Sequence, residues 1–192
     1  MLPDTPLHNH WENPWHPGRR WRRVQLDPRL RGWLLDTSSL TRRLQQCCAG
    51  HFRVRLDWQG WARPALDECQ ALGLRRRQRA LVREVHLLCN DIPWVFARTV
   101  IPRASLRGRE RRLAHLGERP LGAVLFADPR MQRGEVEVAR IDPGTALHAH
   151  ALGEQGAEAG PVWGRRSVFW LGRKPLLVSE IFLDTMDCPN GA

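Results

Sequence analysis

Three strand-length apolar runs, each with one charged residue in phase with its apolar side chains, constrain this chain more than any other feature. The runs and their charges are 175–183 with Glu180, 81–89 with Arg83 and 94–101 with Arg98. Because successive side chains of a strand alternate between faces, each charge is predicted to point into an apolar interior. A lone carboxylate in such a place either finds a cation or takes up a proton. One carboxylate and two guanidiniums directed inward predict a pocket for a small anionic ligand.

Cap and turn residues divide the remaining chain into helices and strands. Asp27-Pro28 places an N-cap residue before a proline at the first helical position, which predicts a helix over 29–35. Ser38 or Ser39 can cap a second helix that runs to about Cys48. The other predicted elements are strands over 51–61, 135–141 and 162–171, short helices over 64–74 and 107–116, and a short apolar segment over 120–126.

Short connections join the strands of the predicted fold. Asn90-Asp91-Ile92-Pro93 is a hairpin turn between the two arginine-bearing strands, and Gly172-Arg173-Lys174 joins the last two strands. The helices are predicted mainly at the front and in the middle of the chain. This arrangement predicts an α+β domain with a single antiparallel β-sheet and helices packed on it.

A chain of 192 residues is long enough for one domain that buries about 70% of its unfolded surface. We place this domain at residues 25–192, with a flexible insertion at 142–160, which is rich in Gly, Ala and His. Residues 1–24 are expected to be a poorly ordered N-terminal arm. No apolar run approaches the roughly 18 residues of a membrane-spanning helix. Residues 1–16 lack the basic start and apolar block of a signal peptide, so we expect a cytoplasmic protein without membrane insertion.

The net charge of +10 first suggests a nucleic-acid partner. However, Lys174 is the only lysine among the 30 basic residues, and tyrosine is absent. We interpret this skew as the residue usage of a GC-rich genome. The densest basic clusters, at 75–79 and 107–112, are then solvated faces, and no nucleic-acid partner is expected. Binding that falls steeply with salt would support the opposite interpretation.

The five cysteines show an odd count, an adjacent pair and no Cys-x-x-Cys spacing, which argues against a disulfide framework and against a zinc site. Without a secretory signal they are expected to be reduced thiols. The histidines at 8, 10 and 16 and the pair at 148 and 150 are weak metal signals. We therefore expect neither a metal nor a cofactor.

Five runs of the chain together resemble chorismate pyruvate-lyase, in the right order over roughly residues 26–184. They are Trp33-Leu-Leu with Ser39-Leu-Thr-Arg-Arg-Leu44, Arg83-Glu-Val-His-Leu-Leu-Cys89, Pro93-Trp-Val-Phe-Ala-Arg-Thr-Val-Ile-Pro102, Pro120-Leu-Gly122, and Trp163-Gly-Arg-Arg-Ser167 followed by Lys174-Pro-Leu-Leu-Val-Ser-Glu180. The resemblance implies a lyase that converts chorismate to 4-hydroxybenzoate and pyruvate, the first step towards the ubiquinone ring. It also implies a cofactor-free fold whose buried pocket lies under flaps.

The resemblance also implies roles for five residues of this chain. Arg83 matches the arginine that holds the ring carboxylate, and Glu180 matches the glutamate that meets the oxygen at the opposite end of the ring. The backbone of Leu121 contacts the product, and Arg98 lies near the site, where it can receive the enolpyruvyl carboxylate. Leu40 stands where the family usually has methionine, a change that keeps apolar volume.

The chemistry of chorismate fits these residue types. Loss of the side chain as pyruvate aromatises the ring, so the enzyme needs only to orient a dianion and manage one proton. A rigid guanidinium fork binds a carboxylate bidentately and stays charged when buried. From the sequence we predict that Glu180, its pKa raised by burial, is protonated and donates to the ether oxygen.

Other interpretations remain open at this stage. Arg83 and Glu180 can form a structural ion pair across neighbouring strands, and Arg98 can extend to the rim of the sheet. Arg165 and Arg166 are left out of the catalytic set as structural residues or guards of the entrance. We expect the protein to be a monomer. As an alternative to an enzyme, it can be a non-catalytic small-anion sensor like those of bacterial transcription regulators. However, the region before the fold is expected to be too short for the DNA-reading domain of such regulators. A relative that makes 3-hydroxybenzoate is a third alternative.

Overall fold

The computed structural model describes residues 14–21, 25–153 and 159–188. Within these ranges, eight antiparallel strands form one sheet in the order β1-β6-β7-β8-β4-β3-β2, and β5 pairs with β7 off this path. The strands are β1 (His16–Pro17), β2 (Phe52–Ala62), β3 (Ala80–Cys89), β4 (Ile92–Pro102), β5 (Met131–Arg133), β6 (Glu137–Ile141), β7 (Val162–Leu171) and β8 (Lys174–Phe182). The single antiparallel sheet predicted from the sequence is confirmed.

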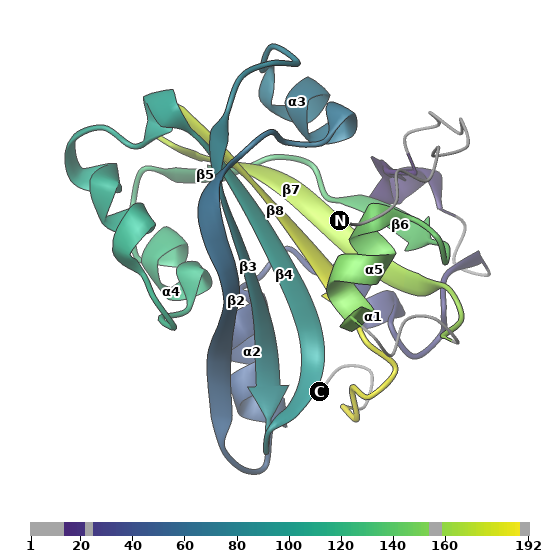
Figure 1. Ribbon diagram of the computed structural model, residues 1–192. Helices are drawn as coiled ribbons and strands as arrows, with labels where there is room; N and C mark the ends of the chain where they lie inside the picture. Colours follow the sequence, from purple (N-terminus) through teal and green to yellow (C-terminus); the bar gives the residue numbers. More distant parts are fainter. Residues whose placement is uncertain (1–13, 22–24, 154–158, 189–192) are drawn as a thin grey trace, which may run out of the picture.

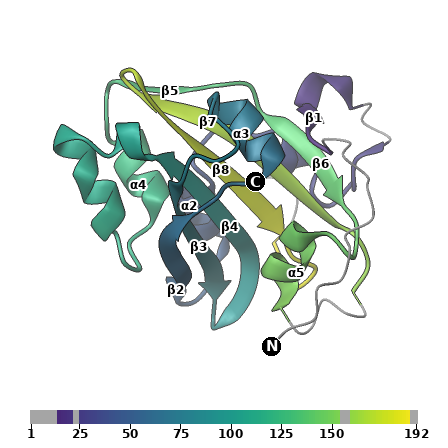
Figure 2. The ribbon, with the colours of Figure 1, turned by 45° about the horizontal axis from the view of Figure 1, so that its top comes forward.

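Helices cover both faces of this sheet (Figure 1). They are α1 (Arg31–Leu34), α2 (Leu40–Cys47), α3 (Leu66–Leu72), α4 (Leu121–Phe126), α5 (Ala146–Leu152) and the 3-10 helices η1 (Gly18–Arg20), η3 (Arg103–Ser105) and η4 (Gly108–His115). We call the face that carries Arg83 and Glu180 the pocket face; α1, α2 and α4 pack on it. The opposite face, covered by α3 and α5, carries Glu84 and Arg98. Figure 2 shows α4 and α5 towards opposite ends of the molecule.

The predicted hairpins are confirmed because their turn residues have the conformations that such turns need. Asn90 and Asp91 have φ of 50° and 65°, a left-handed geometry that Asn and Asp tolerate, and they join β3 to β4. Gly172 has φ of 63° between β7 and β8. The predicted helix over 107–116 differs in type, since η4 is a 3-10 helix.

Two segments bury more than the sequence indicates. Within the expected arm, residues 14–21 are described. His16 and Pro17 join the sheet as β1, which pairs with β6, and the neighbouring Trp15 is buried. Residues 1–13 and 22–24 of that arm lie outside the described residues. Within the expected insertion, α5 forms after a Thr145 cap and buries His148 and Ala151 against the sheet; residues 154–158 lie outside the description. Small and apolar side chains on one side of a short helix supply the buried surface in the second case.

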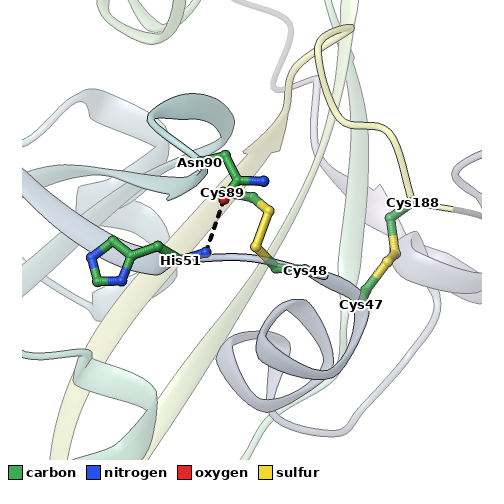
Figure 3. Close-up of a disulfide and its surroundings, with 6 residues drawn as sticks. All are labelled: Cys47, Cys48, His51, Cys89, Asn90 and Cys188. Carbon is green, nitrogen blue, oxygen red and sulfur yellow. Dashed lines mark hydrogen bonds between the residues drawn. A yellow bond between two sulfur atoms is a disulfide. The ribbon is translucent and has the colours of Figure 1, made fainter.

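The expectation of five reduced thiols is wrong for four of them. The structure pairs Cys47 with Cys188 and Cys48 with Cys89, while Cys69 is free and buried (Figure 3). The end of α2 lies beside the end of β3 and beside the segment after β8, so thiols separated by 41 and 141 residues meet there. Spacing in the sequence carries no information about such encounters.

Candidate active site

A cavity lies on the pocket face, between the middle of the sheet and helices α2 and α4. Its floor is Val85, Leu87, Ala97, Thr99 and Val178 of β3, β4 and β8, and its roof includes Leu40, Thr41, Leu121 and Leu125. The empty space, with the open mouth included, is about 550 Å³. Most of this lining is apolar, so any charged group that reaches it is poorly hydrated.

The register of the strands brings Arg83 and Glu180 to this cavity. Arg83 of β3 lies opposite Thr99 of β4, and Thr99 lies opposite Val178 of β8, so all three point to the pocket face. Glu180 follows two residues after Val178 and therefore points the same way. Strand spacing and residue rise put the Arg83 and Glu180 Cα atoms roughly 12 Å apart. The two side chains thus reach the cavity from different sides.

Arg83 is a buried guanidinium without a carboxylate among the described residues. Its Nη2 donates to the backbone oxygens of Gly117, at 2.8 Å, and Arg119, at 3.1 Å, whereas its buried Nε has no partner. Burial lowers the pKa of Arg83 to about 10, so the group remains charged at neutral pH. A buried cation that neutral carbonyls hold and no acid compensates has the electrostatic properties that favour an anion beside it.

Glu180 has a cation, but that cation is not Arg83. Nε of Arg165 donates to Oε2 of Glu180 at 2.6 Å, and Nη1 of Arg165 donates to the backbone oxygens of Trp33 and Asp36, each at 2.6 Å. Arg165 is fully buried, so Glu180 is held in a fixed orientation. Its Oε1 accepts no hydrogen bond from a described residue, and Glu180 lines the cavity. Of the two outcomes that the sequence left open for this carboxylate, the structure shows the cation.

Leu40 and Leu121 both line the cavity. Leu40 begins α2 and Leu121 begins α4, where the first backbone N–H groups have no acceptor within the helix. The neighbouring Gly122 lets the two helices approach, because a Cβ atom there would lie 3.1 Å from Oγ1 of Thr41.

The expectation that Arg98 lies beside this cavity is wrong. Arg98 lies opposite Glu84 in the register, one residue out of phase with the pair of Arg83 and Thr99, so it points to the opposite face. There its Nε donates to Glu68 at 2.7 Å and its Nη1 donates to Glu84. Although burial opposes the charge, these carboxylates raise the pKa of Arg98 above its ordinary value. Apolar residues line both faces, so alternation within one strand does not show which face holds the cavity.

The two arginines of the Trp-Gly-Arg-Arg run divide between the faces in the same way. Arg165 orients Glu180 on the pocket face, whereas Arg166 bonds Asp67 at 2.6 Å and Glu137 at 2.7 Å on the opposite face. Both are buried and both are held by acids, which agrees with leaving them out of the catalytic set.

Sequence reasoning missed one charged residue of the cavity, Arg133. This residue ends the three-residue strand β5, and its side chain lines the cavity beside Phe169. No periodic pattern singles it out, because β5 is too short to show alternation. Its position depends entirely on the pairing of β5 with β7.

No cluster of three or more His, Cys, Asp or Glu side chains is arranged as a metal site in the described part of the chain. Nor does any helix within the described ranges have the length and apolar character needed to cross a membrane.

Comparison with known proteins gives similarities over most of the chain. Residues 16–188 match the family described as chorismate lyase. The chain is 46% identical to a protein of Methylococcus capsulatus named "Probable chorismate pyruvate-lyase", over 80% of this chain and 94% of that one. It is 41% identical to a protein of Nitrosomonas eutropha with the same name, over 88% and 92% of the two chains.

Among solved structures, the C-terminal domain of the histidine utilization repressor from Pseudomonas syringae is similar in fold. The TM-score is 0.51 at 17% sequence identity, and the match covers 74% of this chain and 98% of that domain. At this identity the likeness concerns the fold alone.

Proposed function

The chain belongs to the chorismate lyase family, and on that premise we propose that it converts chorismate to 4-hydroxybenzoate and pyruvate, the first step towards the ubiquinone ring. The observation that carries the proposal is the apolar cavity with the uncompensated guanidinium of Arg83 on one side and the oriented carboxylate of Glu180 on the other. The reaction needs no cofactor, because every bond change occurs within the substrate.

The proposed reaction breaks one carbon–oxygen bond and moves one proton. The ether bond between the ring and the enolpyruvyl side chain breaks, and its electrons leave with the side-chain oxygen. The ring carbon that bears the hydroxyl loses its hydrogen as a proton, and the ring becomes aromatic. The methylene carbon of the side chain gains a proton, which gives pyruvate. The main tasks of the protein are to orient the substrate and to exclude water.

Arg83 is proposed to bind the ring carboxylate. Its carbonyl partners fix the guanidinium at the edge of the apolar floor, while Nε and Nη1 remain without a described acceptor. A charge-assisted bond in such surroundings is stronger than a neutral one. Holding the ring in one orientation can contribute several kcal/mol to catalysis.

Glu180 is proposed to accept a hydrogen bond at the other end of the ring, from the ring hydroxyl. An ion-paired carboxylate is an acceptor and not a donor. The contact with Arg165 therefore replaces our sequence-based hypothesis of a protonated Glu180 that donates to the ether oxygen. The free Oε1 of Glu180 is also suitably placed to draw the proton from the hydroxyl-bearing carbon, since both lie at the same end of the ring.

Leu40 and Leu121 are proposed to form the walls that hold the ring between these charged groups. The backbone N–H of Leu121 is the additional contact that the family resemblance implies. We further propose that the enzyme acts as a monomer in the cytoplasm. The proposed partners are only chorismate and 4-hydroxybenzoate.

The direct test is to incubate the purified protein with chorismate in the presence of a chelator and to identify the products by chromatography. Equal amounts of 4-hydroxybenzoate and pyruvate are expected. The appearance of 3-hydroxybenzoate would correct the product. If chorismate survives but raises the melting temperature of the protein, the cavity belongs to a non-catalytic sensor, as in the alternative drawn from transcription regulators.

A further inference from the structure

Arg133 is a second guanidinium of the cavity without an acidic partner. Its Nε donates to Oγ of Ser167 at 3.0 Å, and its Nη1 donates to the backbone oxygens of Thr37, at 2.9 Å, and Ser38, at 3.3 Å. All three acceptors are neutral. Among the described residues, Nη2 has no acceptor, and no Asp or Glu forms an ion pair with Arg133. The group is therefore anchored on one side and free on the other.

The anchoring contact places Arg133 across the cavity from Arg83. Ser167 of β7 lies opposite Val178 of β8, which lies opposite Thr99 of β4, the neighbour of Arg83 on β3. Arg83 and Ser167 are thus the ends of one row across four strands, with Cα atoms roughly 14 Å apart. Both guanidiniums line the same cavity from opposite ends of this row.

The charges around the cavity do not balance. Arg83, Arg133 and Arg165 contribute three positive charges, and Glu180 compensates one of them. Asp36, the other acid near Arg133, is paired with Arg43 at 2.9 Å. Burial, with a smaller contribution from Arg165, lowers the pKa of Arg133, because these effects outweigh the opposing effects of Glu180 and Asp36. A ligand with two negative charges would compensate the remainder.

We propose that Arg133 binds the second carboxylate of the substrate, the one on the enolpyruvyl side chain, through its free Nη2. This inference rests on the proposed function, and it assigns to Arg133 the role for which Arg98 lies on the wrong face. Arg133 then distinguishes substrate from product, because 4-hydroxybenzoate has a single carboxylate. The departure of pyruvate removes the anion that Arg133 holds.

Arg133 also has a structural contact, since it ties the connection between α1 and α2 to β7. A purely structural role predicts that removal of the guanidinium weakens every ligand alike. Binding of the second carboxylate predicts a selective loss for ligands that carry it. The test must therefore compare matched monoanions and dianions.

The experiment uses Arg133→Met, which keeps an unbranched apolar stem without the guanidinium, and Arg133→Lys, which keeps the charge. Binding of 3-methoxybenzoate and of 3-(carboxymethoxy)benzoate is measured by calorimetry, together with kcat/KM for chorismate. For Arg133→Met, the dianion is expected to lose about 10- to 100-fold in affinity, as for a charged hydrogen bond, and kcat/KM should fall at least as much. The monoanion should change less than about threefold, and Arg133→Lys should recover part of the loss.

Two controls complete the design. The double variant Arg43→Met/Asp36→Asn removes an ion pair that anchors the same connection without leaving a free carboxylate near Arg133, and neither residue lines the cavity, so neither ligand should be affected. Arg83→Met should weaken monoanion and dianion together. An equal loss of both ligands in Arg133→Met, or no loss of either, would overturn the proposal.

The binding comparison does not need turnover. If the unmodified protein fails to convert chorismate, the proposed function fails, while the ratio of dianion to monoanion affinity still tests Arg133. If chorismate is converted and that ratio is unchanged by Arg133→Met, only the role of Arg133 is rejected.

Discussion

Apart from Arg165, which pairs with Glu180, the buried and half-buried arginines of the two faces of the sheet are in opposite electrostatic situations. On the opposite face, Arg98 bonds Glu68 and Glu84, and Arg166 bonds Asp67 and Glu137. On the pocket face, Arg83 and Arg133 have only neutral acceptors among the described residues. Burial alone therefore does not mark a functional arginine. The lack of an acid does, because an uncompensated buried charge is costly unless a ligand neutralises it.

The largest expected effect tests the paired side of this comparison. Arg98→Met leaves the carboxylates of Glu68 and Glu84 buried without their cation, and loss of one partner of a buried pair costs about 3–5 kcal/mol. We expect the free energy of unfolding to fall by that amount in urea titrations, with kcat/KM close to that of the unmodified protein at temperatures where the variant is folded. A stable variant with little activity would instead return Arg98 to the site.

Arg83→Met tests the uncompensated side. Removing the proposed anchor of the ring carboxylate should lower kcat/KM by about 100- to 1,000-fold, or about 3–4 kcal/mol. The free energy of unfolding should not fall by a comparable amount, since no acid is left unpaired. Steady-state kinetics and urea unfolding of the same preparation measure both quantities. Greater destabilisation than in Arg98→Met would contradict the comparison.

The two faces also differ in their cysteines. Both disulfides join the end of α2 on the pocket face, whereas Cys69 in α3 on the opposite face is a free thiol. Cys48–Cys89 ties α2, a wall of the cavity, to the end of β3, and loss of a disulfide typically costs about 2–4 kcal/mol. Dithiothreitol should therefore lower the melting temperature measured by calorimetry. Cys48→Ala should have a lower melting temperature already without reductant, and dithiothreitol should lower it by a smaller further amount, because only Cys47–Cys188 remains to be reduced. An unchanged melting temperature on reduction of the unmodified protein would show that these thiols are not bonded in solution.

Glu180→Gln tests the acceptor role at the other end of the cavity. The amide keeps the shape of the side chain but loses the charge that pairs with Arg165. We expect turnover to fall by about 10- to 100-fold, equal to about 1.4–2.8 kcal/mol, with a smaller effect on the affinity for 4-hydroxybenzoate. Single-turnover kinetics separate the two quantities. Unchanged turnover would remove Glu180 from the chemistry.

The smallest expected effect concerns Asp36, in the connection that covers the pocket face. Although burial opposes its charge, hydrogen bonds from Ser38 and Arg43 lower the pKa of Asp36 to about 2. Its unfolded pKa is near 3.8, so its stabilising contribution is complete above that pH and is lost as the pH falls towards 2. Asp36→Asn should remove about 1–2 kcal/mol of stability at pH 7, and the stability of this variant should fall less steeply than that of the unmodified protein at low pH. The measurement is the free energy of unfolding as a function of pH. If the curves of the two proteins run parallel, Asp36 is not the group responsible for the loss of stability at low pH.

Local sequence patterns predicted the elements of the fold well. Alternating apolar residues with Asn90-Asp91 between them specified β3 and β4, whereas residues 120–126, which were expected only as a short apolar segment, form α4. The same patterns failed for α5, which short-range composition presented as an insertion with little to bury. They also failed for the cysteines, whose partners lie far along the chain.

The sequence by itself determined strands β2, β3, β4, β6, β7 and β8, the α+β class and the residue types of the proposed anion pocket, including Arg83 and Glu180. These features depend on side-chain alternation and turn residues, which act over a few positions. Only the tertiary structure decided that Arg98 turns away from the cavity, that Arg165 neutralises Glu180 and that Arg133 enters the site. The physical reason is that each of these depends on strand register and on which helix covers which face, and both faces of this sheet are buried.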